Sequence, residues 1–476
     1  MKQNFIAGEW VDGMDSEKNI NPSDTSDIIA EYALADAAQT ELAIESAYDA
    51  FPSWEKFPVQ DRSEILVRVG DEIVSRREEL GELVSREEGK TLREGIGEAM
   101  RAGQIFRFFG AEVLRQGGEL FDSVRSGVEV SITRSPVGVV GLILPWNFPI
   151  AIPAWKVAPA LAYGNCVIFK PATLVPATAH VMAEIIINAG IPEGVFNLVM
   201  GSGSQVGGTI VNHSKVNAVS FTGSIPTGRG IAMAAIQRMA KIQLEMGGKN
   251  PLVILDDADL DIAVECAVDG AYFSTGQRCT ASSRLIVTER IHDKFVAALK
   301  DRLDGLTTDH ALKPGTDIGP VVDDKQLQID LEYIRIGIEE GAYLVSGGER
   351  VSRETDGFFL TPALFTETHN DMRINQEEIF GPVASVIRVK DYDEALETAN
   401  NTDFGLSSGI VTTSLKYASH FRRNIRSGVT NVNLPTAGVD YHVPFGGTKE
   451  SSYGAREQGA YAREFYTSVK TAYTKP

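Results

Sequence analysis

The chain has 476 residues, which is too long for one hydrophobic core and predicts two or three domains. Its hydrophobic content of 43% is typical of a soluble globular protein, and its net charge of −19 argues against nucleic acid or an anionic membrane surface as a partner. No apolar run is long enough for a membrane-spanning helix, and residues 1–13 lack the apolar segment of a signal peptide. Three cysteines without metal-ligand spacing predict no metal site and fit a reducing cytoplasm.

Residues 1–13 predict a short hairpin with glycines at its turns. Apolar residues then recur at three- and four-residue spacing through 58–115, which predicts helix. Residues 128–134 alternate between apolar and polar side chains, and residues 465–473 have a similar character. Such a half-polar ribbon suits an edge that pairs with another chain.

From residue 138 short apolar strands alternate with helices, which predicts a parallel sheet covered on both faces. A second α/β series runs from about residue 250 to about residue 443, with a domain boundary expected near the glycine pair 247–248. Ligands bind such sheets at the carboxyl ends of the strands. The predicted strands of the first series are 138–144, 166–169, 196–200, 216–221 and 241–245.

Cys279 has two interpretations, a buried structural thiol or a nucleophile. Small and polar residues at 274–277 favour a sharply turned and accessible backbone, and the neighbouring Arg278 would stabilise a thiolate. Cys166 and Cys266 lie in apolar segments and are expected in the core.

Two polar residues follow predicted strands. Glu245 ends a strand before two glycines, where it is either a general base with a raised pKa or a solvated acid. Asn147 lies between two prolines and two aromatic residues, where it either aims its amide at an oxyanion or simply suits a turn.

Residues 221–228 form a strand–glycine–helix junction that suits a phosphate at the helix N-terminus, beside Gly223 and Ser224. Neither this segment nor residues 201–208 matches G-x-G-x-x-G, the glycine pattern typical of dinucleotide-binding turns. Lys170 ends a strand, where it either binds a ribose or is simply exposed.

Seven segments occur together in one order: PWNFP, FKPA, FTGS, LEMGGKNP, GQRC, EEIFGPV and PFGG. In this combination the chain resembles the NAD(P)-dependent aldehyde dehydrogenase superfamily over essentially its whole length. The resemblance implies an α/β fold with a Rossmann-like dinucleotide-binding domain (1–117 and 137–247), an α/β catalytic domain (248–450) and a small β oligomerisation ribbon (118–136 and 460–476). It also implies a homodimer or a homotetramer.

The resemblance implies that Cys279 attacks the aldehyde and that Asn147, with the Cys279 backbone N–H, holds the resulting oxyanion. Glu245 would activate water to hydrolyse the thioester. Glu457 matches a second acid used for proton relay, although one extra residue, Ala455, interrupts that motif.

The implied cofactor is NADP or NAD. Thr173 stands where strict NAD users often carry a glutamate that repels a 2′-phosphate, so NADP should be tolerated or preferred. The residues expected to contact the cofactor are Trp146, Lys156, Lys170, Thr173, Gly223, Ser224, Glu378 and Phe380.

The substrate funnel implied by the resemblance contains two arginines, which suit a small anionic aldehyde with a distal carboxylate unless they form surface salt bridges. Residues 433–454 look like those of bacterial enzymes that oxidise α-ketoglutarate semialdehyde (2,5-dioxopentanoate). Succinate semialdehyde is the nearest competing substrate, although those enzymes often carry an arginine where this chain has Phe273; a broad-specificity enzyme and a non-catalytic NAD-binding relative are further alternatives. The expected substrate-lining residues are Arg101, Gln104, Arg278, Ala437, Val439 and Phe445.

Overall fold

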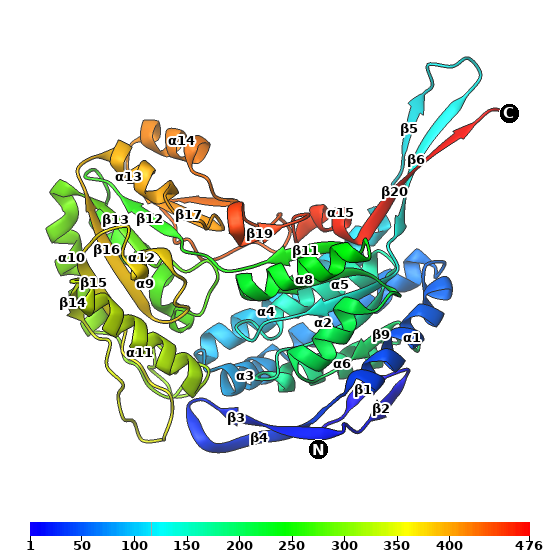
Figure 1. Ribbon diagram of the computed structural model, residues 1–476, viewed down its shortest axis with the longest axis horizontal. Coiled ribbons are helices and arrows are strands. Elements are labelled where there is room, and N and C mark those ends of the chain that lie inside the picture. The colour runs from blue at the N-terminus through cyan, green and yellow to red at the C-terminus, as the bar shows by residue number, and fades with distance from the viewer. Residues whose placement is uncertain (116) are drawn as a thin grey trace.

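The computed structural model describes residues 1–115 and 117–476, so residue 116, inside the predicted range 1–117, lies outside the described residues. Two mixed sheets flanked by helices lie side by side, and a narrow ribbon projects from the end of the molecule that holds the first sheet (Figure 1). Over the described residues, no helix combines the length and apolar character needed to cross a membrane.

The first sheet has eight strands in the order β19-β11-β10-β7-β8-β9-β1-β2. The N-terminal hairpin is confirmed, since β1 and β2 pair antiparallel. The bounds are β1 (Asn4–Ile6), β2 (Glu9–Val11), β7 (Val139–Ile143), β8 (Cys166–Lys170), β9 (Phe196–Leu198), β10 (Val216–Thr222), β11 (Lys241–Glu245) and β19 (Ser452–Tyr453).

Strands β7 to β11 run parallel, which confirms the alternation predicted from residue 138. Ile143 is in register with both Lys170 and Phe221, and Thr222 with Glu245. The polar residues that follow these strands therefore meet at one edge of the sheet. The helices and turns around the sheet are α1 (Ala37–Trp54), α5 (Ala151–Ala162), α6 (Pro176–Asn188), the π-turn η2 (Gly203–Gly207), α7 (Gly208–Asn212) and α8 (Ile225–Gln237).

The predicted helical region 58–115 is confirmed and consists of three helices and a short 3₁₀ turn. Gly89 ends the second helix in the left-handed conformation (φ 100°), which glycine adopts without strain. Thr91 and Glu94 then begin the third helix with a capping box. The elements are α2 (Val59–Ser75), α3 (Arg77–Glu88), α4 (Leu92–Glu112) and η1 (Val113–Arg115).

The chain crosses to the second sheet between Glu245 and Pro251 and returns to the first at β19. The second sheet has the order β14-β15-β16-β13-β12-β17-β18. Its strands are β12 (Pro251–Ile254), β13 (Arg284–Thr288), β14 (Tyr343–Ser346), β15 (Ala363–Thr368), β16 (Val383–Val389), β17 (Ser407–Val411) and β18 (Val429–Val432). Its helices and turns are α9 (Leu260–Tyr272), η3 (Phe273–Gly276), α10 (Glu289–Asp304), α11 (Asp324–Glu339), α12 (Arg373–Gln376), α13 (Tyr392–Asn400) and α14 (Leu415–Asn424).

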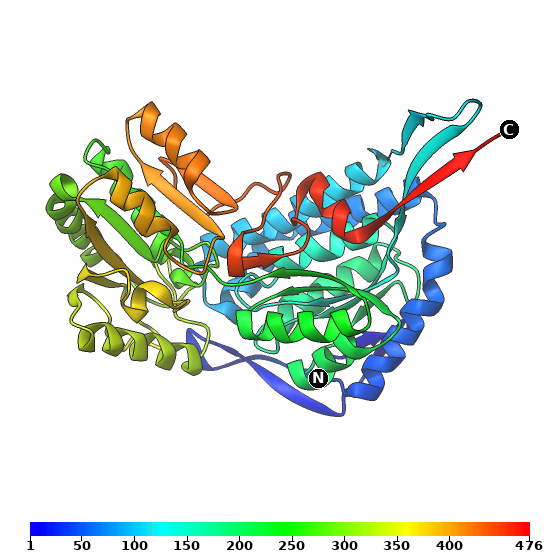
Figure 2. The same cartoon turned by 45° about the horizontal axis from the view of Figure 1, so that its top comes forward.

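The ribbon is a three-stranded sheet of β5 (Glu119–Asp122), β6 (Glu129–Pro136) and β20 (Thr467–Thr474). It stands away from both larger sheets in two views (Figures 1 and 2). The predicted strands near 128–134 and 465–473 are confirmed as one antiparallel pair. The ribbon strand begins at Thr467 rather than at residue 460, because Ala462, Phe465 and Tyr466 pack in the core of the first sheet.

The remaining elements join these parts. A long hairpin of β3 (Asp15–Asn21) and β4 (Asp24–Leu34) forms a separate two-stranded sheet, which lies along the lower edge in Figure 1. The C-terminal segment contains η4 (Lys449–Ser451), η5 (Gly459–Ala462) and α15 (Arg463–Tyr466) before it enters the ribbon.

Candidate active site

Cys279 lies in the loop between η3 and β13, just before a strand of the second sheet. It is partly exposed and lines two cavities. The first, about 350 Å³, also contains Arg101 and is called the Arg101 cavity. The second, about 270 Å³, contains Trp146 and is called the Trp146 cavity. The thiol is thus reachable from both sides.

The backbone before Cys279 turns sharply. Ser274, Thr275 and Gly276 have φ values of 52°, 56° and 67°, all in the left-handed region. This conformation costs about 1–3 kcal/mol at each non-glycine residue, so the surroundings must hold it. The Glu94 carboxylate accepts the Ser274 N–H at 2.7 Å, and the Thr275 hydroxyl donates to the Gly319 carbonyl at 3.2 Å.

Burial, followed by the charges of Glu245 and Glu378, raises the pKa of the Cys279 thiol above its ordinary value. Arg278 was expected to stabilise the thiolate, but its guanidinium instead contacts Asp269 at 3.2 Å and Glu94 at 3.4 Å. A base is therefore needed to form the thiolate. The other two cysteines are buried in the cores, as predicted: Cys166 and Cys266.

Asn147 follows β7 and is buried, and it lines the Trp146 cavity together with Cys279. Its side-chain amide donates to the Gln277 carbonyl at 2.9 Å. An amide NH₂ has two donors, so the second remains for a substrate oxygen. This placement suits an oxyanion donor.

Glu245 ends β11, and its carboxylate accepts the Ser452 hydroxyl at 2.5 Å and the Gln243 amide at 3.2 Å. Burial, followed by the charge of Glu457, raises the pKa of Glu245 well above its ordinary value. A carboxyl with a raised pKa is a better general base than an ordinary one.

Lys156 was predicted to contact the cofactor, but the structure places it elsewhere. It is fully buried, donates to Ser220 at 2.6 Å and forms an ion pair with Glu457. Glu457 is thus connected to Lys156 and, through charge, to Glu245. The extra residue Ala455 does not prevent this arrangement.

Five of the predicted cofactor residues line the Trp146 cavity together: Trp146, Gly223, Ser224, Glu378 and Phe380. Ser224 is the N-cap of α8 and Pro226 lies in the first turn, so the helix N-terminus presents N–H groups suited to a phosphate. Glu378 accepts the Gly248 N–H at 2.8 Å, and burial raises its pKa to about 7. A side chain at Gly247 would meet Glu378 at 2.1 Å, so this approach requires glycine.

Lys170 and Thr173 lie at and just beyond the end of β8, beside β7, and neither lines the Trp146 cavity. Lys170 donates to the Pro171 carbonyl at 2.8 Å, and burial lowers its pKa to about 8. Thr173 donates to the Gly201 carbonyl at 3.3 Å. An ammonium has three donors, so Lys170 retains capacity to bind ribose hydroxyls. Together with the α8 N-terminus, these residues fit an extended dinucleotide.

Five of the six predicted substrate residues line the Arg101 cavity: Arg101, Arg278, Ala437, Val439 and Phe445. Gln104, almost one turn further along α4, does not belong to this lining. The two arginines differ. Arg278 is paired with carboxylates, whereas Arg101 has no ion pair among the residues that the structure describes.

The sequence interpretation missed Lys90, Glu94 and Glu98, which also line the Arg101 cavity. These charged residues follow one another at spacings typical of a solvated helix face. Tertiary contacts nevertheless bury Lys90 and Glu98 and partly bury Glu94, since α4 packs against α5 and Lys90 contacts the Asn147 carbonyl.

The chain matches the model of the aldehyde dehydrogenase family over residues 10–472. It is 43% identical over 477 residues to the alpha-ketoglutaric semialdehyde dehydrogenase of Bacillus subtilis (99% of this chain, 98% of the relative). It is 42% identical over 479 residues to the alpha-ketoglutarate semialdehyde dehydrogenase of Haloferax volcanii, with the same coverage. The crystal structure of a Staphylococcus aureus betaine aldehyde dehydrogenase mutant in complex with NAD⁺ superposes with a TM-score of 0.97 at 34% identity, covering 100% of this chain and 97% of that one.

The chain therefore belongs to the aldehyde dehydrogenase family. It is an oxidoreductase that oxidises an aldehyde with NAD(P), and its α/β architecture is that of the family.

Proposed function

We propose that the enzyme oxidises α-ketoglutarate semialdehyde to 2-oxoglutarate. One observation carries the substrate assignment: Arg101 lines the same cavity as Cys279 and has no ion pair within the described part of the chain. Burial lowers the pKa of Arg101, and the charge of Asp440 acts against this shift without a direct ion pair. A half-buried guanidinium that makes no direct ion pair suits a substrate carboxylate. The similarity to two enzymes that carry this substrate in their names supports the same choice.

In the proposed reaction the Cys279 thiolate forms a bond to the aldehyde carbon, and the carbonyl oxygen becomes an alkoxide. The second N–H of the Asn147 amide and the Cys279 N–H stabilise this oxygen. A cofactor bound in the Trp146 cavity supplies a nicotinamide that accepts hydride from the aldehyde carbon, which leaves a thioester on Cys279.

Glu245 then removes a proton from water, which attacks the thioester carbon and releases the thiolate. The Glu245 carboxylate points toward Ser452 in this structure, so this step requires it to turn toward Cys279. The Glu457 carboxylate, held by the Lys156 ammonium next to Glu245, is the group that can take up the proton. The net change adds one water oxygen to the aldehyde carbon and removes its hydride.

Succinate semialdehyde, which has a shorter chain, is the alternative substrate. The residue six positions before Cys279 is Phe273, whose ring lies 5.8 Å from the guanidinium of Arg93. An aromatic side chain supplies no charge there, and Arg278 is paired with carboxylates, so Arg101 is the arginine we assign to the substrate carboxylate.

The test compares kcat/KM for α-ketoglutarate semialdehyde, succinate semialdehyde and the uncharged aldehyde propanal. We expect the first to be favoured over propanal by about a hundredfold, and Arg101→Met to remove about 1.5–3 kcal/mol of that preference. The matched control is Arg107→Met, in the same helix, where the arginine pairs with Asp71 at the surface. Equal activity on propanal, or an Arg101→Met variant indistinguishable from the control, would overturn the substrate assignment.

A further inference from the structure

Lys90 is a buried charge in the connection between α3 and α4 that the reaction described above does not use. Its side chain is 1% exposed. The ammonium donates to Glu98 at 2.7 Å and to the main-chain carbonyl of Asn147 at 2.8 Å, and it lies 3.7 Å from Glu88. It also lies 3.9 Å from the centre of the Phe148 ring. Burying an ammonium is costly unless its donors are satisfied, and here the partners come from the end of α3, from α4 and from the turn after β7.

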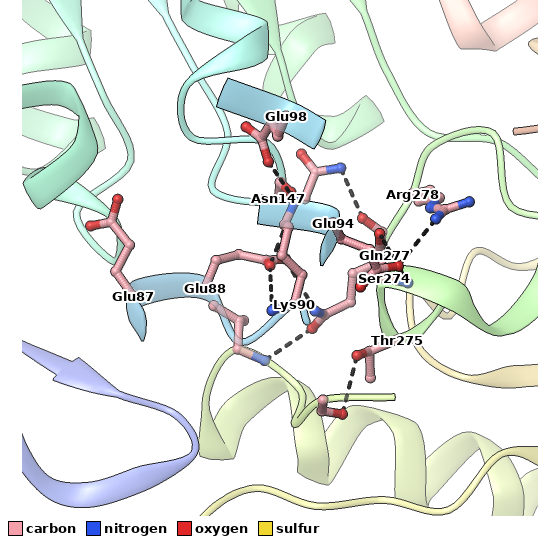
Figure 3. Close-up of polar contacts among 12 residues, drawn as sticks. Glu87, Glu88, Lys90, Glu94, Glu98, Asn147, Ser274, Thr275, Gln277 and Arg278 are labelled. Carbon is pink, nitrogen blue, oxygen red and sulfur yellow. Dashed lines mark hydrogen bonds and ion pairs between the residues drawn. The ribbon is translucent and has the colours of Figure 1, made fainter. Parts of the chain in front are cut away.

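These contacts close into a ring (Figure 3). Lys90 holds the Asn147 carbonyl, and the Asn147 amide donates to the Gln277 carbonyl. The Gln277 side chain donates to Glu88 at 3.3 Å, and Glu88 faces Lys90 again. We call Lys90, Asn147, Gln277 and Glu88 the Lys90 ring.

Hydrogen bonds connect the Lys90 ring to neighbouring segments on both sides. Glu98, bound to Lys90, accepts the N–H groups of Ile150 and Ala151 at 2.9 and 3.0 Å, which fixes the entry into α5. On the other side, the side-chain carbonyl of Gln277 accepts the Val322 N–H at 3.0 Å. The turn that carries Asn147 and the loop that carries Cys279 are thereby tied to one buried cation.

We propose that Lys90 is a positioning residue, which sets the orientation of the Asn147 amide toward the substrate oxygen by holding the Asn147 carbonyl within the Lys90 ring. This inference rests on the proposed oxyanion role of Asn147. Lys90 fixes the backbone of the donor residue, and Gln277 fixes one of its two amide N–H groups. The second N–H of the Asn147 amide is then held in one orientation relative to Cys279. Positioning errors of about 1 Å at a reacting group can cost a hundredfold in rate.

The experiment measures the single-turnover rate of NAD(P)H formation at saturating aldehyde for wild type, Lys90→Met, Asn147→Ala and the double variant. We expect Lys90→Met to lower this rate ten- to a hundredfold, with little change in the Kd for NAD(P). The double variant should be no slower than Asn147→Ala alone, because Lys90 acts through Asn147.

The matched control is Glu87→Gln. Glu87 is the neighbouring buried carboxylate, but it holds the N–H groups of Ala177 and Thr178 at the start of α6 and not the Lys90 ring. We expect wild-type rates from this variant. Lys90→Gln removes the ammonium but keeps a polar side chain beside Glu98, so it carries the same test if Lys90→Met does not fold, with a slowed rate expected.

Three outcomes are decisive. A wild-type rate in Lys90→Met or in a folded Lys90→Gln overturns the proposal. Losses that multiply in the double variant also overturn it, because they show that Lys90 acts independently of Asn147. An unchanged rate in Asn147→Ala contradicts the oxyanion role itself, and this failure is distinguished because it appears in a variant that leaves Lys90 intact.

Discussion

The side-chain amide of Asn147 donates to the main-chain carbonyl of Gln277, two residues before Cys279. Asn147 follows a strand of the first sheet, and Gln277 precedes a strand of the second. The proposed oxyanion donor and the loop that carries the nucleophile therefore adjoin different sheets, and a direct hydrogen bond joins the donor to that loop. Movement of one sheet against the other would change their separation.

Alkylation of Cys279 should accelerate with pH into the alkaline range, because burial and nearby carboxylates raise the pKa of the thiol. Glu245→Gln removes the largest of the nearby charges that raise it, so its alkylation profile should move to lower pH. The measurement is the rate of iodoacetamide incorporation against pH, with Cys279→Ser reporting the background from Cys166 and Cys266. Coincident profiles for wild type and Glu245→Gln would contradict this account.

Thr173→Glu should lower kcat/KM for NADP by about tenfold or more and change that for NAD much less. A carboxylate there would repel a 2′-phosphate near Lys170, and each tenfold corresponds to about 1.4 kcal/mol. Thr173→Gln is the matched control because it has the same size without the charge. Equal losses in both variants would show that bulk, and not charge, is responsible.

Truncation after Tyr466 should reduce the mass of the assembly measured by light scattering. It removes β20, which covers one edge of β6, and it exposes the half-polar ribbon whose side chains already include Leu120 at 87% exposure. We propose that the ribbon pairs with a second copy of the chain, since an edge strand is a ready template. Removing only Lys475 and Pro476, which follow β20, is the control and should leave the mass unchanged. An unaltered mass after the longer truncation would contradict this role of the ribbon.

Glu88→Gln should gain stability relative to wild type as the pH rises from 5 to 8. Burial raises the pKa of Glu88 from 4.5 to about 8, so the folded protein keeps a proton that the unfolded chain loses, and wild-type stability falls across this interval. The slope difference is at most about 1.4 kcal/mol per pH unit. Urea unfolding at several pH values measures it.

The control for this effect is Glu87→Gln, because the pKa of Glu87 is raised to about 7 only. Its stability difference from wild type should level off near neutral pH, while that of Glu88→Gln continues to grow toward pH 8. Parallel curves for the wild type and Glu88→Gln would contradict a raised pKa at Glu88.

The alternation of strands and helices from residue 138 was predictable because each element has its own local periodicity. Polar residues at strand ends, such as Asn147 and Glu245, were predictable for the same reason, since parallel strands bring their carboxyl ends to one edge. The break of the first helical region at Gly89 needed only the recognition of a glycine C-cap.

Contacts between distant segments were not predictable in this way. Arg278 adjoins Cys279 in sequence, yet its charge is taken up by Glu94 from α4. Lys156 contacts Glu457, which lies 301 residues further along the chain. The helical pattern around Lys156 gives no indication of this contact. Lys90 follows two glutamates in a stretch typical of a solvated surface, although packing buries it completely.

The most direct test of the central claim is the intact mass of Glu245→Gln after mixing with α-ketoglutarate semialdehyde and NADP or NAD. If Cys279 forms the thioester and Glu245 activates the water, the variant should produce one equivalent of NAD(P)H and stop, with one acyl group attached at Cys279. The same mixture with Cys279→Ser should give neither product. Continued turnover by Glu245→Gln, or an acyl group on Cys166 or Cys266 in place of Cys279, would contradict the mechanism.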